Sequence, residues 1–329
     1  MCLIIDDARA RAALSMADTI AAMRDVYAAH SRGEIEESPR ANLIIPKGFL
    51  RLMAAAWPNR KLAGYKELHR SNGYAGASYH LFDLEAAKLL AIMDASYITA
   101  VRTGACGGVA ADLLAAHDAD VLGVIGTGKE ARAQVEAICS VRDIRRIQAF
   151  GRDPERRAAF CTEMSDRFQL DAVPMPDGPS ALAGAQVVAV ATNTGTTGPA
   201  FFGDWIEDHP VHINSIGSTL PRQREIDEHV WSRVDRIVID AQLLLEESGD
   251  AIEAQRQGTL DGSKVALLGD VITGASKGRS DPAQRTLYKS VGSALQDLAT
   301  AALIYEKVRD SDQACPQMPS FLKVGMMQD

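Results

Sequence analysis

The stretch VLGVIGTGKEARAQVEAI, residues 121–138, decides the fold of this chain. Five mostly apolar residues run into the pattern Gly126-x-Gly128-x-x-Ala131, and a helix-forming segment rich in Ala, Glu and Arg follows. Strand, glycine turn and helix in this order are typical of the start of a dinucleotide-binding domain. Gly126 allows the tight turn, Gly128 lets a pyrophosphate approach the backbone, and Ala131 keeps the helix close to the strand. We interpret this segment as a nucleotide site; the alternative is a structural glycine turn in another α/β fold.

Downstream of this stretch, strand-like and helix-like segments alternate, which predicts a parallel, doubly wound sheet. The last helix is expected at about 282–307, because apolar residues recur there with a spacing near 3.6. These residues are Leu287, Val291, Leu295, Leu298 and Ala302. The candidate strands are 121–125, 146–150, 187–191, 211–216 and 235–240.

The residues before the glycine turn have a different pattern. Residues 15–30 are expected to form an amphipathic helix with Ser15 as its N-cap. Between residues 40 and 94, short apolar runs are divided by turn signals such as PKG and PNR, which predicts an antiparallel, hairpin-linked sheet. Residues 97–116 are expected to be helical. We expect the long C-terminal helix to return to this first domain, which makes the domain discontinuous.

Composition narrows the functional class. The 329 residues are 47% hydrophobic and 24% charged, which is typical of a globular protein long enough for two domains. The net charge of −8 argues against a nucleic-acid surface. No apolar stretch approaches the roughly 18 residues that span a bilayer, and no signal peptide is apparent. The five cysteines have no CxxC spacing and are interpreted as reduced thiols of a cytoplasmic protein without a metal site.

The segment after the second strand bears on the choice of nicotinamide cofactor. NAD-binding domains of this type place an acidic residue there to bond the ribose hydroxyls. Here Gly151 and Arg152 occupy this place, and a guanidinium suits the 2′-phosphate of NADP. NADP(H) is therefore the preferred cofactor, with NAD(H) as the alternative if Arg152 is a solvated loop residue and Asp153 binds the ribose. Asp153 is also well placed to cap a helix that starts at Pro154.

Four cations lie in apolar settings before the glycine turn: Arg40, Arg51, Lys66 and Arg102. Each taken alone is more often a solvated or paired residue than a functional one. Together, beside a nucleotide domain, they suggest a site for a substrate carboxylate. A lysine whose pKa is lowered by nearby arginines can also transfer a proton.

At this point the sequence resembles the ornithine cyclodeaminase/mu-crystallin family. The resemblance runs through nearly the whole chain, and its last two blocks are the most specific because ordinary Rossmann enzymes lack them. The blocks are SPRANL (38–43), LAGYKE (62–67), IMDASYITAVRTGA (92–105), VIGTGKEA (124–131), TNT (192–194), HINSIGSTLPRQREID (212–227), LGDVITG (268–274) and LYKSVGSALQDLATAALIYEK (287–307).

The resemblance implies a homodimer and a two-domain α/β fold. Residues 1–118 and 300–329 would form an α+β substrate-binding and dimerisation domain with the antiparallel sheet. A Rossmann domain, 119–299, would be inserted between them. Members of the family move a hydride between a nicotinamide and the α-carbon of an amino or imino acid.

Residue by residue, the family's substrate-carboxylate arginine falls on Arg40, its active-site lysine on Lys66 and its second arginine on Arg102. Arg51 has no counterpart of this kind in the family, so we interpret it as a structural residue. Met53 is expected in the pocket wall. We expect the nicotinamide amide near Ser78 and near the turn at 290–292. The full set of expected cofactor contacts is Ser78, Gly126, Thr127, Gly128, Glu130, Ala131, Arg152, Thr192, Asn193, Ile216, Gly217, Ser218, Ser290, Val291 and Gly292.

One departure from the family pattern concerns the reaction. Cyclodeaminases have an acidic residue in the loop that here reads GSTLP at 217–221, and Thr219 takes its place. A threonine cannot be a general base near neutral pH, so ring-forming deamination of a basic amino acid is disfavoured. Thr219 is instead expected to contact the substrate.

The sequence therefore predicts an NADPH-dependent reductase of α-imino acids, either cyclic ketimines or open-chain imines. The alternatives are an NAD-dependent cyclodeaminase, a non-catalytic protein that binds NADPH or another ligand, and an opine-type or amino acid dehydrogenase. The expected partners are a small imino or amino acid and a second copy of the chain, with neither nucleic acid nor membrane.

Overall fold

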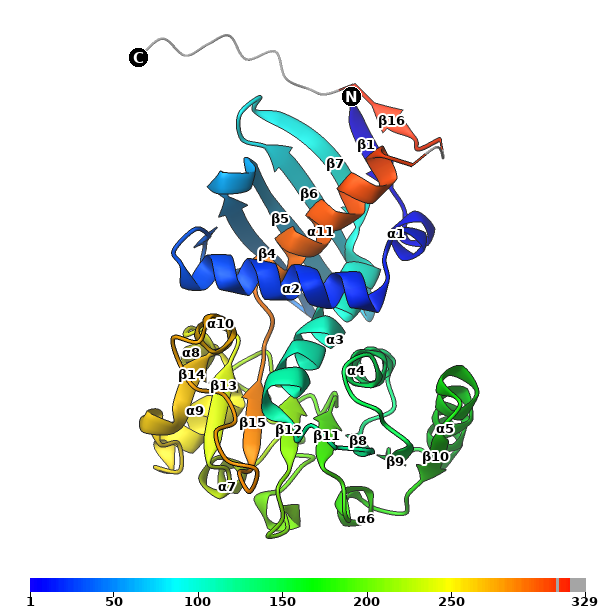
Figure 1. Cartoon of the computed structure of the whole chain (residues 1–329). Helices are drawn as coiled ribbons and strands as arrows, with labels where there is room; N and C mark the ends of the chain where they lie inside the picture. Colours follow the sequence, from blue (N-terminus) through cyan, green and yellow to red (C-terminus); the bar gives the residue numbers. More distant parts are fainter. Residues whose placement is uncertain (312–313, 320–329) are drawn as a thin grey trace. The chain divides into compact units, whose positions relative to one another are not determined.

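The computed structural model describes residues 1–311 and 314–319, and the chain divides into two compact units (Figure 1). Unit 1 joins residues 1–102 to the C-terminal segment that starts at Ser293, and unit 2 is Thr103–Gly292. Of the predicted segment 300–329, residues 312–313 and 320–329 lie outside the described residues. The protein is of the α/β class, with a parallel sheet in unit 2 and a mixed, mostly antiparallel sheet in unit 1.

Unit 2 is built on eight parallel strands in the order β10-β9-β8-β11-β12-β15-β13-β14. From β8 the chain proceeds outward to β9 and β10, and then returns to β11 on the other side of β8. This reversal is the switch point at which open α/β sheets bind ligands, beyond the carboxyl ends of the strands. The bounds are β8 (Val121–Ile125), β9 (Arg146–Phe150), β10 (Asp171–Pro174), β11 (Val187–Val190), β12 (His212–Ser215), β13 (Arg236–Ile239), β14 (Val265–Leu267) and β15 (Thr286–Lys289).

Both faces of this sheet are buried. Along β11, Val188 and Val190 belong to one apolar cluster, whereas Val187 and Ala189 belong to another, because successive side chains point to opposite faces. Helices on both faces explain why these strands read as continuous apolar runs. The helices are α4 (Lys129–Cys139), α5 (Pro154–Phe168), α6 (Gly178–Leu182), α7 (Glu228–Arg233), α8 (Leu244–Glu247), α9 (Gly249–Arg256) and α10 (Leu268–Thr273).

The five predicted strands of unit 2 are confirmed, but the predicted helix at 282–307 is wrong in its first part. Thr286–Lys289 is strand β15, which pairs with β12 and β13 inside the sheet. The chain then turns at Gly292, whose φ is +76°, and helix α11 spans Ala294–Arg309. The helical spacing of Leu287 and Val291 was a coincidence, because Leu287 is buried in strand β15 and Val291 is buried in the turn that follows it.

Unit 1 contains a sheet in the order β16-β1-β7-β6-β5-β4-β2, with β3 paired to β4. Its β1–β7 pair is parallel and its other pairs are antiparallel, so the antiparallel sheet predicted between residues 40 and 94 is confirmed. The strands are β1 (Cys2–Ile5), β2 (Glu36–Glu37), β3 (Ala41–Ile45), β4 (Gly48–Trp57), β5 (Leu62–Ser71), β6 (Tyr74–Asp83), β7 (Lys88–Asp94) and β16 (Gln317–Met318).

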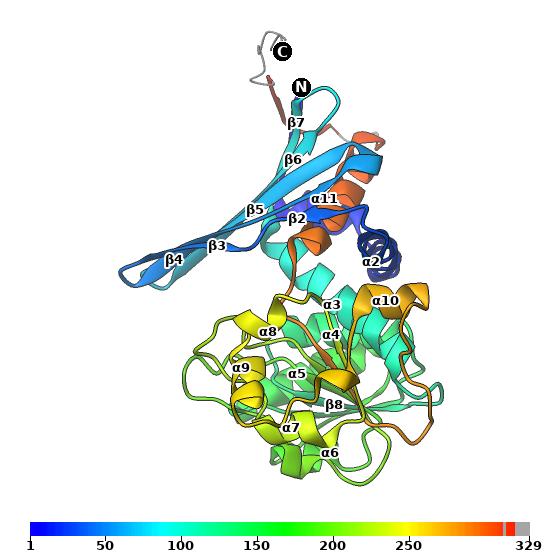
Figure 2. The same cartoon turned by 90° about the vertical axis from the view of Figure 1, so that its left-hand side faces the viewer.

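Helices α1 (Asp7–Ala13), α2 (Met16–Ser31) and α11 accompany this sheet. Ser15 caps α2 by accepting a hydrogen bond from the Asp18 amide, as expected. Helix α11 packs against β4, β5 and β6 and against α2, so both helices cover the same face of the sheet (Figures 1 and 2). The C-terminal helix thus lies on the N-terminal sheet.

The boundary between the units falls inside helix α3 (Ala95–Leu114), earlier than the predicted boundary after residue 118. Gln134 of α4 donates a hydrogen bond to the carbonyl of Thr103 at 2.9 Å. A methyl group on Gly104 would lie 2.5 Å from the carbonyl oxygen of Ala133, so α3 and α4 are in backbone contact there. These contacts tie α3 from Thr103 onward to unit 2. At the other boundary, unit 1 resumes at Ser293 and not at the predicted residue 300.

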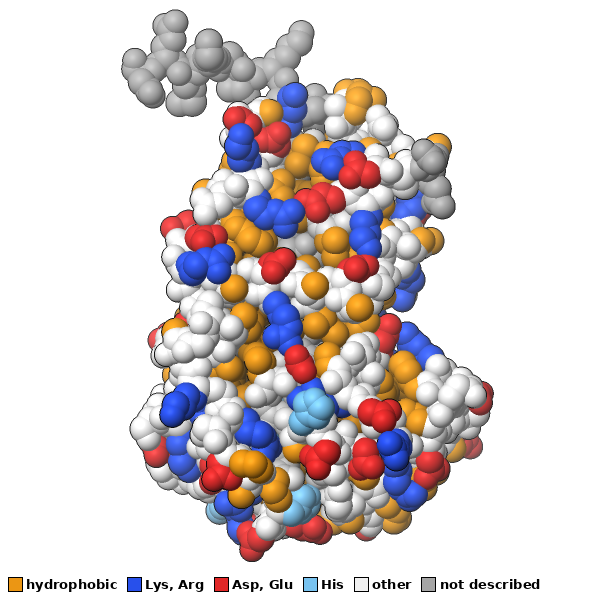
Figure 3. Space-filling model, viewed as in Figure 1, with side chains coloured by type: hydrophobic (Ala, Val, Ile, Leu, Met, Phe, Trp, Pro, Cys, Tyr) orange, Lys and Arg blue, Asp and Glu red, His pale blue; other side chains and the backbone are white. Residues whose placement is uncertain are grey.

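The surface drawn in Figure 3 mixes basic, acidic and apolar side chains, without a broad area of one charge sign. The five cysteines are free thiols. Among the described residues, no helix combines the length and apolarity needed to cross a membrane.

Candidate active site

The register of unit 1 brings three buried side chains into one row across the sheet. Met53 on β4 is paired with Lys66 on β5, and Lys66 is paired with Tyr79 on β6. All three are less than 5% exposed. Strand alternation points them to one face, and the contacts of Lys66 with α11 show that this is the face covered by that helix.

Lys66 shares a buried carboxylate with Arg102. The Nζ atom of Lys66 lies 2.7 Å from Oδ2 of Asp297, and Nε of Arg102 lies 3.1 Å from Oδ1 of the same residue. Lys66 also donates to Thr99 Oγ1 at 3.4 Å. The structure therefore unites two of the predicted cations around an acid that the sequence interpretation missed. A signal was present, since Asp297 interrupts the apolar stripe that holds Leu295 and Leu298.

The first turn of α11 is itself held by hydrogen bonds. Gln296 accepts from Nη1 of Arg102 at 2.7 Å and donates to the Tyr27 hydroxyl at 2.5 Å. The amide of Ala294 donates to the Glu37 carboxylate, which caps the helix in place of a side chain on Ser293. The position of Asp297 is thus set by contacts to α2 and β2 as well as by its own helix.

Burial changes the acid–base properties of this row. The pKa of Lys66 is lowered from 10.5 to about 8, mainly by burial; Asp297 acts to raise it, and the charges of Arg102 and Arg40 act to lower it. Lys66 is therefore poised to exchange a proton near neutral pH. Burial and the charge of Asp297 raise the pKa of the Tyr79 hydroxyl well above 10, and this hydroxyl has no hydrogen-bond partner among the described residues.

Two further arginines lie toward the hairpin of β3 and β4. Arg40 directly precedes β3, and its charge acts on Lys66. Arg51 lies two residues before Met53 on β4 and so shares the face of Lys66. Its Nε donates to Asn42 Oδ1 at 2.7 Å, and its guanidinium lies 5.5 Å from the centre of the Phe49 ring. These contacts are consistent with the structural role assigned to Arg51.

Ser78 lies on the face of the sheet opposite to Lys66. Because Tyr79 points to the face of Lys66, the neighbouring Ser78 side chain points to the opposite face. There its hydroxyl donates to Glu67 at 3.1 Å and lies 3.3 Å from Nε2 of His80. The expected contact of Ser78 with the nicotinamide stays a prediction.

In unit 2, every expected cofactor contact follows the carboxyl end of a strand or opens the next helix, so the sheet gathers them at one edge. The glycine turn follows β8, Arg152 follows β9, Thr192 and Asn193 follow β11, residues 216–219 follow β12, and residues 290–292 follow β15. This is the edge at which parallel sheets bind nucleotides.

The glycine turn fits a pyrophosphate. Gly126 has a φ of +103°, and a methyl group there would run into the carbonyl of Ala191. Gly128 is the N-cap of α4 and makes no side-chain capping bond, so the amides at the start of the helix are open to an anion. A methyl group on Gly128 would meet no atom within 4 Å, which leaves room for a phosphate against the backbone.

The loop after β9 places Gly151 against the glycine turn. A methyl group on Gly151 would lie 2.8 Å from Thr127 Oγ1. The adjacent Arg152 is exposed and makes no hydrogen bond or ion pair to the described residues. Asp153 caps α5 as expected, accepting from the amides of Glu155 at 3.0 Å and Arg156 at 3.1 Å. One of its oxygens is thus already engaged within the protein.

A second buried ion cluster connects the loops after β11 and β12. The Glu225 carboxylate accepts from the amides of Thr192 and Gly217, each at 2.7 Å. Lys289 lies 2.9 Å from the Asp250 carboxylate and donates to the carbonyl of Gly217 at 2.6 Å. Both loops are therefore fixed from beneath the binding edge, a role that was not identified from the sequence.

Several expected cofactor contacts direct their polar groups inward as a result. The Thr192 hydroxyl is bound to Glu225, and the Ser218 hydroxyl donates to the carbonyl of Gln223. In the turn at 290–292, the Ser290 hydroxyl and the amides of Val291 and Gly292 all donate to Asp240, at 2.6, 3.1 and 2.7 Å. These three donors are already engaged within the protein, and the expected position of the nicotinamide amide near this turn stays a prediction. Thr219 is half-buried in its loop and Asn193 is exposed.

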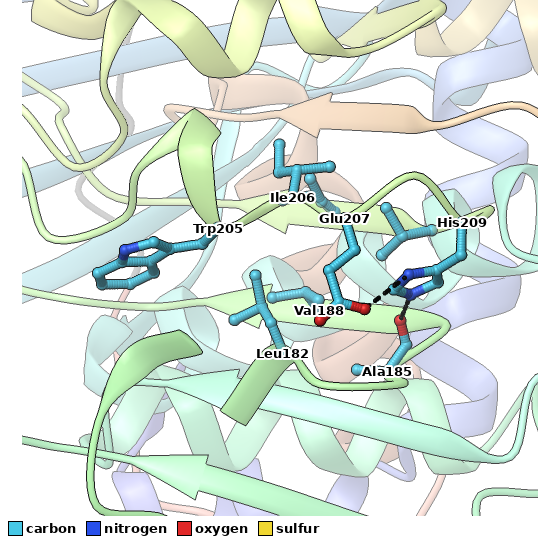
Figure 4. A pocket seen from close by; sticks show the side chains of 9 residues that line it. Leu182, Ala185, Val188, Trp205, Ile206, Glu207 and His209 are labelled. Atoms are coloured by element: carbon cyan, nitrogen blue, oxygen red, sulfur yellow. Dashed lines mark hydrogen bonds and ion pairs between the residues drawn. The ribbon is translucent and has the colours of Figure 1, made fainter. Parts of the chain in front are cut away.

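A small apolar cavity lies elsewhere in unit 2 (Figure 4). Leu182, Val188, Trp205 and Ile206 line it. His209, which also lines it, donates from Nε2 to the Ala185 carbonyl at 3.0 Å, and its Nδ1 lies 3.3 Å from Glu207. Its volume of about 10 Å³ holds at most one water molecule. It is formed near the amino ends of β11 and β12, opposite to the binding edge, and we do not assign it to a ligand.

The sequence profile of one protein family matches residues 4–312: the ornithine cyclodeaminase/mu-crystallin family. The chain belongs to this family. A Bacillus cereus relative, Delta(1)-pyrroline-2-carboxylate reductase, is 34% identical over 229 residues, which are 69% of this chain and 69% of the relative.

Two solved structures of family members superpose over almost the whole chain. The Delta(1)-pyrroline-2-carboxylate reductase of Thermococcus litoralis, in complex with NADH and L-proline, has a TM-score of 0.89 and 29% identity, covering 94% of this chain and 98% of its own. An archaeal alanine dehydrogenase dimer with bound NAD has a TM-score of 0.87 and 28% identity, covering 96% and 99%. The present family member is accordingly an NAD(P)-dependent oxidoreductase acting on CH–NH or CH–NH2 groups.

Gly126 and Gly128 are expected to differ in how well they tolerate substitution by alanine. Gly126→Ala should lower the free energy of unfolding by about 2 kcal/mol or more, because alanine is strained at this positive φ and meets a backbone oxygen. Gly128→Ala should leave stability within about 0.5 kcal/mol but weaken cofactor binding, since its methyl group enters the space beside the open amides. Denaturant unfolding and cofactor titration measure the two effects. Equal stability of the two variants would contradict this assignment.

Proposed function

We propose that this protein is an NADPH-dependent reductase of α-imino acids. The observation that supports this most directly is the buried cluster of Lys66, Arg102 and Asp297 in unit 1, in which two cations share one carboxylate and the charge of Arg40 also acts on Lys66. Basic side chains gathered in a buried site suit an anionic ligand. The carboxylate of an imino acid is such a group, and arginines bind it with paired hydrogen bonds.

In this proposal the substrate carboxylate binds Arg40 and Arg102, and Lys66 faces the imine nitrogen. Bound nicotinamide supplies a hydride for the imine carbon. Reduction of the C=N bond also requires a proton on nitrogen, and Lys66 donates it from its ammonium form. Met53 and Tyr79, the buried neighbours of Lys66, keep water from the ammonium group. The same groups serve oxidation of the amine, with Lys66 as the base.

Thr219 supports reduction over ring-forming deamination. Cyclisation of a basic amino acid needs a carboxylate near the side-chain amine, and a hydroxyl provides neither its charge nor its basicity. Thr219 stands at the place of the cyclodeaminases' acid, in the loop that Glu225 holds. The proposed substrate therefore has a side chain without a positive charge.

The proposed reaction can be tested with a panel of cyclic ketimines and of oxo acids mixed with amines. NADPH absorbance should fall with at least one of them. Because Lys66 must carry a proton, the rate of reduction should decline as pH rises through about 8, the pKa of this lysine. K66A should lose at least a hundredfold in kcat, in line with the usual contribution of a general acid.

A matched control for Lys66 is Lys61→Ala, which removes an exposed lysine paired only with Glu85. NADPH titration should show that K66A still binds cofactor, because all the residues expected to hold it except Ser78 lie in unit 2. Full activity in K66A would overturn the mechanism, and ammonia release without net cofactor turnover would identify a cyclodeaminase instead.

We propose NADP(H) as the cofactor on the evidence of the loop after β9. Arg152 is exposed beside the glycine turn and has no acidic partner in the part of the chain that the structure describes, and Asp153 already caps α5. Arg152→Ala should raise the KM for NADPH about tenfold or more, the equivalent of a lost charge-assisted hydrogen bond, and leave the KM for NADH within twofold.

The control for Arg152 is Arg146→Ala, at the amino end of the same strand, where the arginine pairs with Asp171 at 2.8 Å. This change should affect neither cofactor. A parent enzyme that uses NADH better than NADPH would refute the preference, even if it reduces imines.

We further propose a homodimer formed through the hairpin of β3 and β4. Four apolar side chains of this hairpin are exposed to solvent: Leu43 (62% exposed), Ile44 (71%), Ile45 (39%) and Leu52 (40%). Adjacent exposed apolar residues of this kind mark an association surface. The alanine dehydrogenase relative was solved as a dimer, which favours a second copy as the occupant.

Replacing Leu43 and Ile44 together with glutamate should convert a dimer into a monomer by light scattering after gel filtration. The burial of two apolar side chains is lost and charges are placed in the contact. Leu84→Glu, at an exposed apolar residue outside the hairpin, should remain dimeric. A parent protein that is already monomeric, or a dimeric double variant, would rule out this interface.

A further inference from the structure

We propose that Asp297 is the positioning residue that joins Lys66 and Arg102 into a single rigid unit for binding and protonating the substrate. This inference rests on the proposed imine reduction, but it concerns a different residue. Asp297 does not need to touch the substrate, because it acts through the two cations that do.

The geometry of the carboxylate supports this role. Each oxygen of Asp297 serves a different cation: Oδ2 lies 2.7 Å from Lys66 Nζ and Oδ1 lies 3.1 Å from Arg102 Nε. The side chains of Asp297, Lys66 and Arg102 are 0%, 2% and 7% exposed, so water cannot replace either contact. A carboxylate engaged on both oxygens cannot rotate without breaking one ion pair. The distance between the ammonium and the guanidinium is thereby fixed.

The position of Asp297 at the start of α11 also supports this role. It lies in the first turn of α11, where the helix dipole favours a negative charge. Its neighbour Gln296 holds a second nitrogen of Arg102 and is held in turn by Tyr27. The arginine is therefore oriented by two successive residues of one helix turn, which places the remaining edge of its guanidinium in a defined direction.

Asp297 also controls the charge of Lys66. The groups that face this lysine are Arg102 and Thr99 from α3, Arg40 before β3, Tyr79 from β6, Met53 from β4 and Asp297 from α11. Of these, only Asp297 is an acid. Without it, burial and two arginines would act on the lysine unopposed, and its pKa would fall below the value of about 8. The protonated donor would then be scarce at neutral pH.

The test compares Asp297→Asn, Asp297→Glu and the control Glu306→Gln, an exposed acid on the same helix paired with Arg60. D297N should lose more than tenfold in kcat for imine reduction, and the pH at which its rate declines should move down by about one unit or more. Its affinity for NADPH should not change. D297E keeps the charge but not the distance, so it should keep the pH midpoint and raise the KM of the imino acid several-fold. E306Q should match the parent.

These measurements distinguish a positioning role of Asp297 from a purely structural role, and they distinguish failure of this inference from failure of the proposed function. An active D297N with the parent's pH profile and KM would overturn the inference. If D297N is misfolded and fails to bind NADPH, the D297E variant provides the test. Parental KM and kcat in D297E would also overturn the inference. A parent enzyme without activity on any imine would refute the proposed function, and the KM and pH profile of amine oxidation would then test Asp297.

Discussion

The burial of Lys66 and Arg102 around one carboxylate is the constraint on which unit 1 depends. An unpaired charge in a protein interior costs several kcal/mol, so both cations need Asp297 nearby. Asp297 is separated from them by 231 and 195 positions in the sequence. The last helix packs on the first sheet, and this brings Asp297 to the two cations. The Rossmann unit is an insertion in the sequence of unit 1, and both electrostatics and apolar packing stabilise this discontinuous unit.

Unit 2 uses buried charge for a different purpose. Lys289, Asp250 and Glu225 lie beneath the carboxyl edge of the parallel sheet, and Glu225 holds the backbone of two loops by their amides. Asp240 does the same for the turn at 290–292. Loops at such an edge have few regular backbone partners, and fixed carboxylates supply them. The glycine turn is held differently: the Gly126 amide donates to the Phe150 carbonyl, and Arg132 donates to the carbonyls of Thr127 and Gly128.

The comparison with known relatives and the site geometry answer different questions. Relatedness establishes a nicotinamide-dependent oxidoreductase of imino or amino acids, a class that includes pyrroline-2-carboxylate reductases and alanine dehydrogenases. Which reaction this member performs depends on a few side chains that the shared fold does not determine. In the proposed function, Lys66 transfers the proton, Arg152 bears on the choice of cofactor, and Thr219 bears on the substrate side chain.

The sequence by itself determined the elements whose pattern is local. The β8–turn–α4 segment, the hairpin sheet, the caps at Ser15 and Asp153, and the cations Lys66 and Arg102 were all identifiable, because periodicity, glycine placement and capping depend on neighbours in the chain. It mistook β15 for helix, since a position in a sheet depends on distant partners. Only the tertiary structure decided that Asp297, Glu225 and Asp240 are the acids that organise the two units. A buried ion pair is a contact in space: a polar residue in an apolar stripe, such as Asp297, does not show in the sequence which partner the fold brings to it.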